Sequence, residues 1–419
     1  MKKTVALLTA LMLALLLVTG CGGAPQKSDA DDFTQVQPET QADAQQTAAS
    51  PDYRAIWFSY LEWSGLNTAD EASFTQGVAA VMQNCKDLGL NTIIVQVRPF
   101  GDAIYPSKYF PWSHLLTGTQ GQAPAYDPLA IFVEQAHAQG LRIEAWINPY
   151  RVKMSEASPP QLAEGNAAVA HPEWVKEAAG GLYFDPSNSD VRQYICDGVE
   201  EVLRAYDVDG VQFDDYFYPV TDESFDAEEY AQQGGGMALA DWRRQNVNLL
   251  VKQVYDMVQR VEQETGRTVV FGISPQGNND NNYDTQYSDV AMWLSTPGYV
   301  DYVMPQVYWG YNFTLQSGSD RFAFENIISE WMAMPRDAAV QLYFGLGAYR
   351  IGVGDESSTP SDEWTSGSNL AKMAKTLAEK GAGGYALYRY DSLYRAGEQQ
   401  ALAAAECEAL RAYHAQLNA

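Results

Sequence analysis

Eight short apolar runs rich in β-branched and aromatic residues alternate with eight longer amphipathic stretches from residue 52 onward. The predicted strands are 54–59, 91–97, 142–147, 210–214, 269–273, 301–305, 341–346 and 384–388. The predicted helices are 74–88, 128–139, 190–206, 238–265, 288–294, 322–334, 369–379 and 399–416. Strict alternation is typical of a parallel sheet made of βα units, and eight such units predict a closed (β/α)8 TIM barrel in the α/β class.

Glycines stand where several predicted helices turn back into the sheet. Gly89, Gly140 and Gly381 each follow a helix and precede a strand, which is the position of a left-handed helix cap. No glycine-rich phosphate loop follows the first strand, which argues against an open dinucleotide-binding sheet. We therefore expect residues 53–419 to form one barrel domain.

Three predicted strand-to-helix connections, 98–126, 148–189 and 216–237, are far longer than the usual ~2–6 residues. In a TIM barrel these connections all lie at the C-terminal face, where active sites are found. The sequence thus predicts long loops that form a deep groove or a lid over that face.

The first residues have the parts of a secretory signal. Lys2 and Lys3 precede an apolar run over 5–18, and small residues then lead to Cys21 in an ending that resembles a lipobox. We expect 1–21 to be a lipoprotein signal peptide with Cys21 as the lipidated residue. An ordinary cleaved signal with a chance cysteine is the alternative, and the apolar run is shorter than the ~20 residues of a spanning helix.

Residues 22–52 are rich in Ala, Gln, Asp, Ser, Thr and Pro and have almost no large apolar side chains. Such a segment cannot bury enough surface to fold, so we expect a disordered polar tether. The predicted location is extracytoplasmic, with a lipid anchor in the cell membrane, or in the outer membrane of a Gram-negative host.

Charge and metal-binding residue types exclude several classes of function. The formal net charge of −26 makes nucleic acid a poor partner. Cys85, Cys196 and Cys407 have no short-spaced pair, and the four histidines lack zinc-ligand spacing, so we expect no metal and no cofactor. Loop 276–284 is rich in oxygen donors, for which Asx turns are a simpler explanation than calcium. A bridge between Cys85 and Cys407 stays open, and we expect a monomer.

Side chains alternate across a strand, so every second residue of a barrel strand points inward. Near the strand ends this places polar and aromatic residues on one axis: Gln96, Arg98, Glu144, Trp146, Asn148, Gln212, Asp214, Tyr216, Ser274, Gln276, Gln306, Tyr308 and Tyr388. Polar side chains can hydrogen-bond the hydroxyls of a sugar, and aromatic rings can stack on its C–H faces, so this combination suits a carbohydrate ligand. The alternative is a fully satisfied internal polar network.

Asp214 and Asp215 end the fourth predicted strand, and glycoside cleavage commonly uses two carboxylates. Asp214 shares the inward phase, so we expect it to be the nucleophile or base. Asp215 is then a supporting carboxylate or proton donor, unless it only caps the next turn. Because strands five and six end without a carboxylate, further candidates for the donor are Glu144, Asp102 and Asp391. Glu144 could equally pair with Arg98 in a structural role.

Five motifs, over 53–57, 96–103, 145–151, 214–219 and 304–309, occur in an order that resembles the glycosyl hydrolase-like 10 family, formerly a domain of unknown function. The resemblance covers about 53–395. It implies that Asp214 and Asp215 match the acidic motif of the family. It also implies that Arg98, Asn148, Gln306 and Tyr308 match its sugar-binding positions.

Some bacterial members of that family resemble enzymes that cut peptidoglycan glycan strands stripped of their peptides. We therefore expect a glycoside hydrolase, an O-glycosidase that acts on a cell-envelope polysaccharide such as peptidoglycan glycan. Position alone adds Asp102, Trp146, Tyr216 and Tyr388 to the expected substrate-binding residues, and Glu144 to the catalytic ones. The alternatives are a non-catalytic glycan-binding lipoprotein and a hydrolase of an imported or extracellular polysaccharide.

Overall fold

In this computed structural model the described residues are 53–155, 158–159 and 161–417, and they belong to one compact unit. The expected signal peptide, Cys21 and the tether lie outside the described residues. Within the described part of the chain, no helix has both the length and the apolar composition needed to cross a bilayer.

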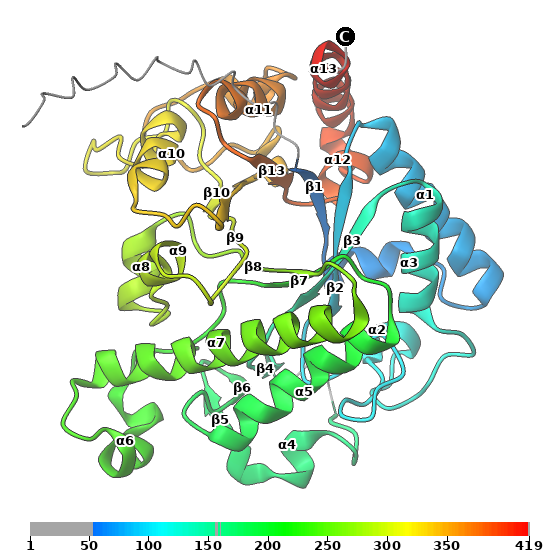
Figure 1. Ribbon diagram of the computed structural model, residues 1–419. Coiled ribbons are helices and arrows are strands. Elements are labelled where there is room, and N and C mark those ends of the chain that lie inside the picture. The colour runs from blue at the N-terminus through cyan, green and yellow to red at the C-terminus, as the bar shows by residue number, and fades with distance from the viewer. Residues whose placement is uncertain (1–52, 156–157, 160, 418–419) are drawn as a thin grey trace, which may run out of the picture. The chain divides into compact units, whose positions relative to one another are not determined.

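Parallel strands form the centre of the molecule, and the long helices lie outside them (Figure 1). The described residues contain ten strands of this sheet: β1 (Tyr53–Phe58), β2 (Thr92–Arg98), β3 (Arg142–Ile147), β7 (Gly210–Phe213), β8 (Val270–Ile273), β9 (Tyr302–Val303), β10 (Gln306–Val307), β11 (Gln341–Leu342), β12 (Phe344–Leu346) and β13 (Gly384–Leu387). Their bounds agree with the predicted strands to within a few residues, except that the predicted sixth and seventh strands are each interrupted.

The sheet closes on itself through these two interrupted strands. β9 pairs with β11, where Tyr302 lies beside Gln341, and β10 pairs with β12, where Gln306 lies beside Gly345. Since β9 continues into β10 and β11 into β12, each pair of pieces is one barrel strand. Among the described residues the ring therefore has eight strands, as the alternating pattern predicts.

The outer helices are α1 (Glu71–Asp87), α3 (Pro128–Ala138), α5 (Ser189–Ala205), α7 (Leu239–Thr265), α9 (Val290–Ser295), α10 (Phe324–Ala333), α11 (Asn369–Glu379) and α13 (Gln400–Leu417). Local chemistry fixes their ends. Asp127 accepts a hydrogen bond from the Ala130 amide at the start of α3, with Pro128 in the first turn. After α1 and α3 the chain turns at Gly89 and Gly140, which have φ of 82° and 73°.

The long connections at the carboxyl ends of the strands carry structure of their own. The connection after β3 forms a three-stranded antiparallel sheet of β4 (Arg151–Lys153), β5 (Val175–Ala178) and β6 (Gly181–Phe184). The sequence pattern did not reveal this sheet, because three or four residues are too few to show a period. The other short helices are α2 (His114–Thr117), α4 (Ala167–Ala170), α6 (Ala227–Gln233), α8 (Asn279–Asp284) and α12 (Asp391–Tyr394), and the 3-10 turns are Tyr60–Gly65, Pro172–Trp174, Glu223–Phe225, Ala348–Arg350, Glu363–Thr365 and Gly397–Gln399.

Two separate cores hold the barrel together. The larger lies between strands and helices, where β1 contributes Ile56 and Phe58. The smaller lies inside the ring and consists of Tyr53, Ala55, Trp57, Ile94, Trp146, Tyr302, Met304 and Ala386. Alternate residues of β1 thus face opposite sides, as strand geometry requires. Large aromatic rings fill the interior together with a few polar groups.

The three cysteines of the barrel, Cys85, Cys196 and Cys407, lie on α1, α5 and α13 and are buried free thiols. The bridge left open between Cys85 and Cys407 is therefore not formed. Burial raises the pKa of Cys85 and Cys196 to about 12, so both act as small core residues.

Candidate active site

A cavity of about 180 Å³ opens at the carboxyl ends of the barrel strands. It is lined by Trp57, Trp146, Gln212, Asp214, Asp215, Tyr216, Ser274, Gln306, Tyr308, Tyr349 and Tyr388. Seven of these were expected at the site from the sequence: Trp146, Asp214, Asp215, Tyr216, Gln306, Tyr308 and Tyr388. Strand alternation had also placed Gln212 and Ser274 on the inward face.

A second hollow of about 280 Å³ continues from this cavity toward α8. It shares Asp215, Gln306, Tyr308 and Tyr349 with the first and adds Gln276, Gly277, Asn278, Asn281, Trp309 and Arg350. The two hollows form one elongated cleft with Asp215 at their junction. A cleft of this form suits a polymer with one unit on each side of Asp215.

Asp214 is held from the side of β3. Its Oδ2 accepts hydrogen bonds from Trp146 Nε1 at 3.1 Å and Asn148 Nδ2 at 3.0 Å, and its Oδ1 accepts from Asn148 Nδ2 and the Tyr216 amide. Burial raises the pKa of Asp214 to about 7, although the positive charge of Arg151 opposes the rise. The carboxylate is therefore fixed in orientation and close to its titration point at neutral pH.

Asp215 is held from the side of β10. Its Oδ1 accepts a hydrogen bond from Gln306 Nε2 at 2.9 Å, and the same nitrogen donates to the Ser274 carbonyl. Burial raises the pKa of the Asp215 carboxyl as well, while the bond from Gln306 opposes the rise. Two neighbouring carboxylates are thus oriented by different strands, Asp214 by β3 and Asp215 by β10.

Tyrosine and tryptophan rings line much of the cavity around the two carboxylates. Tyr308 and Tyr388 are stacked with ring centroids 5.5 Å apart, and Tyr349 meets Tyr308 edge to face at 5.5 Å. Trp57 meets Tyr388 edge to face at 5.8 Å. Tyr349 comes from a 3-10 turn after β12, so strand alternation had not predicted it. Flat apolar faces beside hydroxyl groups are suited to the two kinds of surface on a sugar.

Beneath the cavity a chain of hydrogen bonds crosses the barrel interior. Trp57 Nε1 donates to Gln212 Oε1 at 2.6 Å, and Gln212 Nε2 donates to the Tyr302 hydroxyl at 2.8 Å. The hydroxyls of Tyr302 and Tyr53 then donate to the two oxygens of Glu144. Burial raises the pKa of Glu144 to about 7.

Glu144 points inward, as expected, but the structure does not bring it to the cavity. Alternation predicts the direction of a side chain but not its depth, and Glu144 pairs with two tyrosines below the residues that line the cleft. Its contacts are those of an internal polar network, which was the structural alternative. They do not include Arg98.

Arg98, expected to bind substrate, lies on the outer side of the barrel wall. The pairing of β2 with β3 shifts register between Gln96 and Arg98, and this irregularity reverses the direction of the last side chain. The Arg98 guanidinium lies 3.9 Å from the centroid of the Phe110 ring and beside Gly198 of α5. The structure therefore corrects the inward placement of Arg98.

Asp102, also expected at the substrate, is fully buried within the loop after β2. Its Oδ2 lies 3.2 Å from His114 Nδ1 and accepts from Gln120 Nε2 at 3.0 Å. Gln120 in turn contacts Asn166 of the next long loop. Asp102 thus ties two loops of the barrel mouth together and does not line the cleft.

Arg151 is a buried cation near Asp214 that strand alternation did not single out, since it begins β4 in the loop after β3. Its guanidinium lies 5.1 Å from the Phe100 ring centroid and 5.3 Å from that of Tyr216, a ring that is 53% exposed at the rim. Its Nε donates to the Pro99 carbonyl at 2.9 Å. The positive charge lowers the pKa of Asp214.

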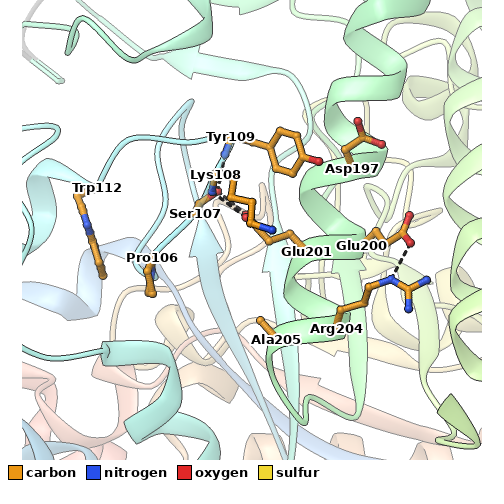
Figure 2. Close-up of a pocket in the computed structure, with 10 residues that line it drawn as sticks. All are labelled: Pro106, Ser107, Lys108, Tyr109, Trp112, Asp197, Glu200, Glu201, Arg204 and Ala205. Carbon is orange, nitrogen blue, oxygen red and sulfur yellow. Dashed lines mark hydrogen bonds and ion pairs between the residues drawn. The ribbon is translucent and has the colours of Figure 1, made fainter.

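A wider groove of about 730 Å³ lies elsewhere, between the segment after β2 and α5 (Figure 2). Glu201 accepts from the Lys108 amide and the Ser107 hydroxyl, and Arg204 pairs with Glu200 at 2.7 Å. The carboxylates of Glu200 and Glu201 thus already have partners, and none of the residues expected at the site lines this groove.

Loop 276–284 uses its oxygen donors for its own backbone. Asn278 caps α8 by accepting from the Asp280 amide, and Asn282 bonds to the Gln276 amide and carbonyl. Among the described residues no group of three or more His, Cys, Asp and Glu side chains is arranged to hold a metal ion.

Comparison with known proteins identifies the family of the chain. The sequence profile described as Glycosyl hydrolase-like 10 matches residues 52–365. The chain belongs to this family. Its relatives include the glycosyl hydrolase DigH of Escherichia coli strain K12, 32% identical over 96% of both chains. The glycosyl hydrolase YngK of Bacillus subtilis strain 168 is 35% identical over 72% of this chain, and the match spans 61% of YngK.

Solved structures with the same fold are also glycoside hydrolases. The glycoside hydrolase domain of PgaB (BpsB) from Bordetella bronchiseptica has a TM-score of 0.56 at 16% identity and covers 84% of this chain and 98% of that domain. An alpha-L-fucosidase from Paenibacillus thiaminolyticus has a TM-score of 0.52 at 14% identity, over 88% of this chain and 49% of that one. At such identities the likeness establishes the barrel fold that this glycosyl hydrolase-like 10 protein shares.

Proposed function

We propose that this protein hydrolyses O-glycosidic bonds in a cell-envelope polysaccharide, with peptidoglycan glycan strands as the substrate. The observation that carries the proposal is the pair of buried carboxylates, Asp214 and Asp215, in an aromatic-lined cleft. Burial raises the pKa of both carboxyls above the ordinary value of an aspartate, which suits groups that take part in acid–base chemistry. Membership of a glycosyl hydrolase-like family supports the same reaction class.

The proposal is tested by mass spectrometry of fragments released from purified peptidoglycan, both intact and stripped of peptides. We expect the full chain to release glycan fragments, and Asp214→Asn to lower the rate by ~10²–10⁴-fold. Circular dichroism checks that the variant is folded, and Asp256→Asn, on the exposed side of α7, is the matched control. Full activity in Asp214→Asn would remove this carboxylate from the reaction.

The same assay separates hydrolysis from simple glycan binding. A non-catalytic receptor shows sugar affinity that falls in Trp146→Ala but forms no product over long incubation. A hydrolase of imported or extracellular polysaccharide leaves peptidoglycan intact and cuts another polymer. Release of fragments from peptidoglycan supports the envelope substrate against both.

We further propose that the protein acts outside the cytoplasm while anchored by lipid at Cys21. The support is the sequence itself, with basic residues, an apolar run and a small-residue ending directly before Cys21. The test is metabolic labelling with a fatty acid and membrane fractionation. We expect Cys21→Ala to lose the label and leave the membrane fraction, and an unlabelled wild-type protein would contradict the anchor.

A further inference from the structure

The two carboxylates follow the same barrel strand, β7. Asp214 and Asp215 are consecutive in the chain, and among the described residues no other carboxylate lines the cavity. Across the ring from β7, the cavity is lined by Trp57 of β1, Tyr349 of the turn after β12 and Tyr388 at the end of β13. Direct displacement by an enzyme carboxylate, or by water that a carboxylate activates, places the second carboxyl on the opposite side of the sugar from the proton donor. Among the described residues that line the cavity, no second carboxyl stands opposite the proton donor, so neither direct displacement by a carboxylate nor attack by activated water has the group it requires.

Asp214 is also poorly placed to be a nucleophile. Both of its oxygens already accept hydrogen bonds from Trp146, Asn148 and the Tyr216 amide. These donors lower the electron density that an attacking oxygen needs and fix the carboxylate in one orientation. A buried, oriented carboxylate of this kind is well suited to accept one more hydrogen bond, from a donor on the substrate.

Among the described residues, Asp215 is the one carboxylate that lines both hollows of the cleft. When sugar units occupy the two hollows, the oxygen that joins them lies near this junction. A proton donor is needed at that oxygen. Asp214 lines the first hollow only, which places it beside the sugar unit whose bond is cleaved.

We propose that the substrate is a 2-acetamido sugar and that its own acetamido oxygen is the nucleophile, with Asp214 holding the acetamido N–H and Asp215 acting as acid and base. This assignment rests on the proposed function and names the substrate class of the same site. Some glycoside hydrolases are known to rely on such assistance from the substrate. The first cavity has a volume of about 180 Å³, which is below the ~300–1,000 Å³ of typical small-molecule pockets. A cavity of this size suits a single sugar unit.

The reaction has two steps. The acetamido carbonyl oxygen forms a bond to C1 while the bond from C1 to the leaving oxygen breaks, and Asp215 gives its proton to that oxygen. The positive charge of the resulting ring is stabilised by Asp214 at the acetamido nitrogen. Water then attacks C1 and passes a proton to Asp215, and the acetamido group is restored. One water is consumed, and C1 keeps its configuration after two inversions.

The test compares three forms of purified peptide-free peptidoglycan glycan with the full chain. The strands are used as isolated, after chemical removal of the N-acetyl groups, and after replacement of those groups by trifluoroacetyl groups. Fluorine withdraws electrons from the carbonyl oxygen with little change of size. We expect kcat to fall by roughly tenfold or more on the trifluoroacetyl strands, with KM nearly unchanged, and cleavage of the deacetylated strands to be lost.

The stereochemistry gives an independent readout. Proton NMR of the first products should show retained configuration at C1. Equal kcat on native and trifluoroacetyl strands, inverted products, or a trapped glycosyl ester on Asp214 would each overturn the inference while hydrolysis itself stands. Absence of cleavage on all three strands would instead overturn the proposed function, and this inference with it.

Variants separate the two carboxylates. An aryl chitobioside has a leaving group that needs no protonation, so Asp215→Ala should still release the phenol in a first rapid turnover. Asp214→Ala should be slow on both the aryl chitobioside and the native strands, and Asp256→Asn should match the wild type. The reverse pattern, with Asp214→Ala active on the aryl substrate, would exchange the two roles and overturn the assignment.

Discussion

The hydroxyl of Tyr302 donates a hydrogen bond to Oε2 of Glu144 at 2.5 Å, inside the barrel. Tyr302 also receives a hydrogen bond from Gln212, whose side chain contacts Trp57 at the floor of the cavity. Glu144 therefore supports the floor of the site from below without reaching the substrate. Its position explains how a carboxylate expected to be catalytic serves the site through other residues.

Glu144→Gln should change how stability depends on pH. Burial raises the pKa of Glu144 from its ordinary 4.5 to about 7, so its contribution to folding is fully present below about 4.5 and is lost as pH rises through 7. A rise of this size corresponds to at most roughly 3 kcal/mol. We expect the free energy of unfolding in urea to fall less between pH 5 and pH 8 in Glu144→Gln than in the wild type.

The exposed Glu325→Gln on α10 is the control for that measurement and should keep the wild-type pH dependence. If Glu144→Gln and the wild type lose the same free energy between the two pH values, Glu144 is not a buried carboxyl with a raised pKa.

Asn148→Ala should weaken catalysis through Asp214. The Asn148 amide donates to both oxygens of Asp214 and thereby lowers the pKa of that carboxyl. Loss of a hydrogen bond to a charged group costs ~1.5–3 kcal/mol, so we expect kcat to fall by ~10–100-fold. The acid limb of the pH–rate profile should move to higher pH, because Asp214 then holds its proton more strongly.

The matched control for this variant is Asn326→Ala, an exposed asparagine on α10. An acid limb that stays in place in Asn148→Ala would show that ionised Asp214 does not govern that limb.

Gln306→Met should act on the opposite limb. Gln306 Nε2 donates to Asp215 and lowers the pKa of that carboxyl, so its removal should raise the pKa further. If Asp215 must be protonated to act, the alkaline limb of the pH–rate profile moves to higher pH. A shift of the acid limb instead would mean that Asp215 works in its ionised form.

Much of this fold follows from the sequence, because buried strands and amphipathic helices leave clear periods and glycines mark the turns. The site follows from the same rule only while each strand stays regular. Trp146 and Asp214 fall on the cavity because β3 and β7 keep their alternation. Arg98 does not, because β2 shifts register just before it. Tyr349 comes from a turn and Arg151 from an added strand, so no strand period could reveal them.

Arg98→Met tests the corrected position of Arg98 most directly. The guanidinium is buried against Phe110 and α5, and its Nε and Nη1 have no hydrogen-bond partner in the described structure. Replacing a buried ion by an apolar side chain of similar length is often neutral or stabilising, by up to ~1–4 kcal/mol. We expect urea unfolding to show equal or higher stability, and glycan cleavage to stay within about twofold of the wild type.

The exposed Arg411→Met on α13 controls for loss of charge alone. A large drop in kcat/KM with stability unchanged would instead mean that Arg98 reaches the substrate, as strand alternation first indicated.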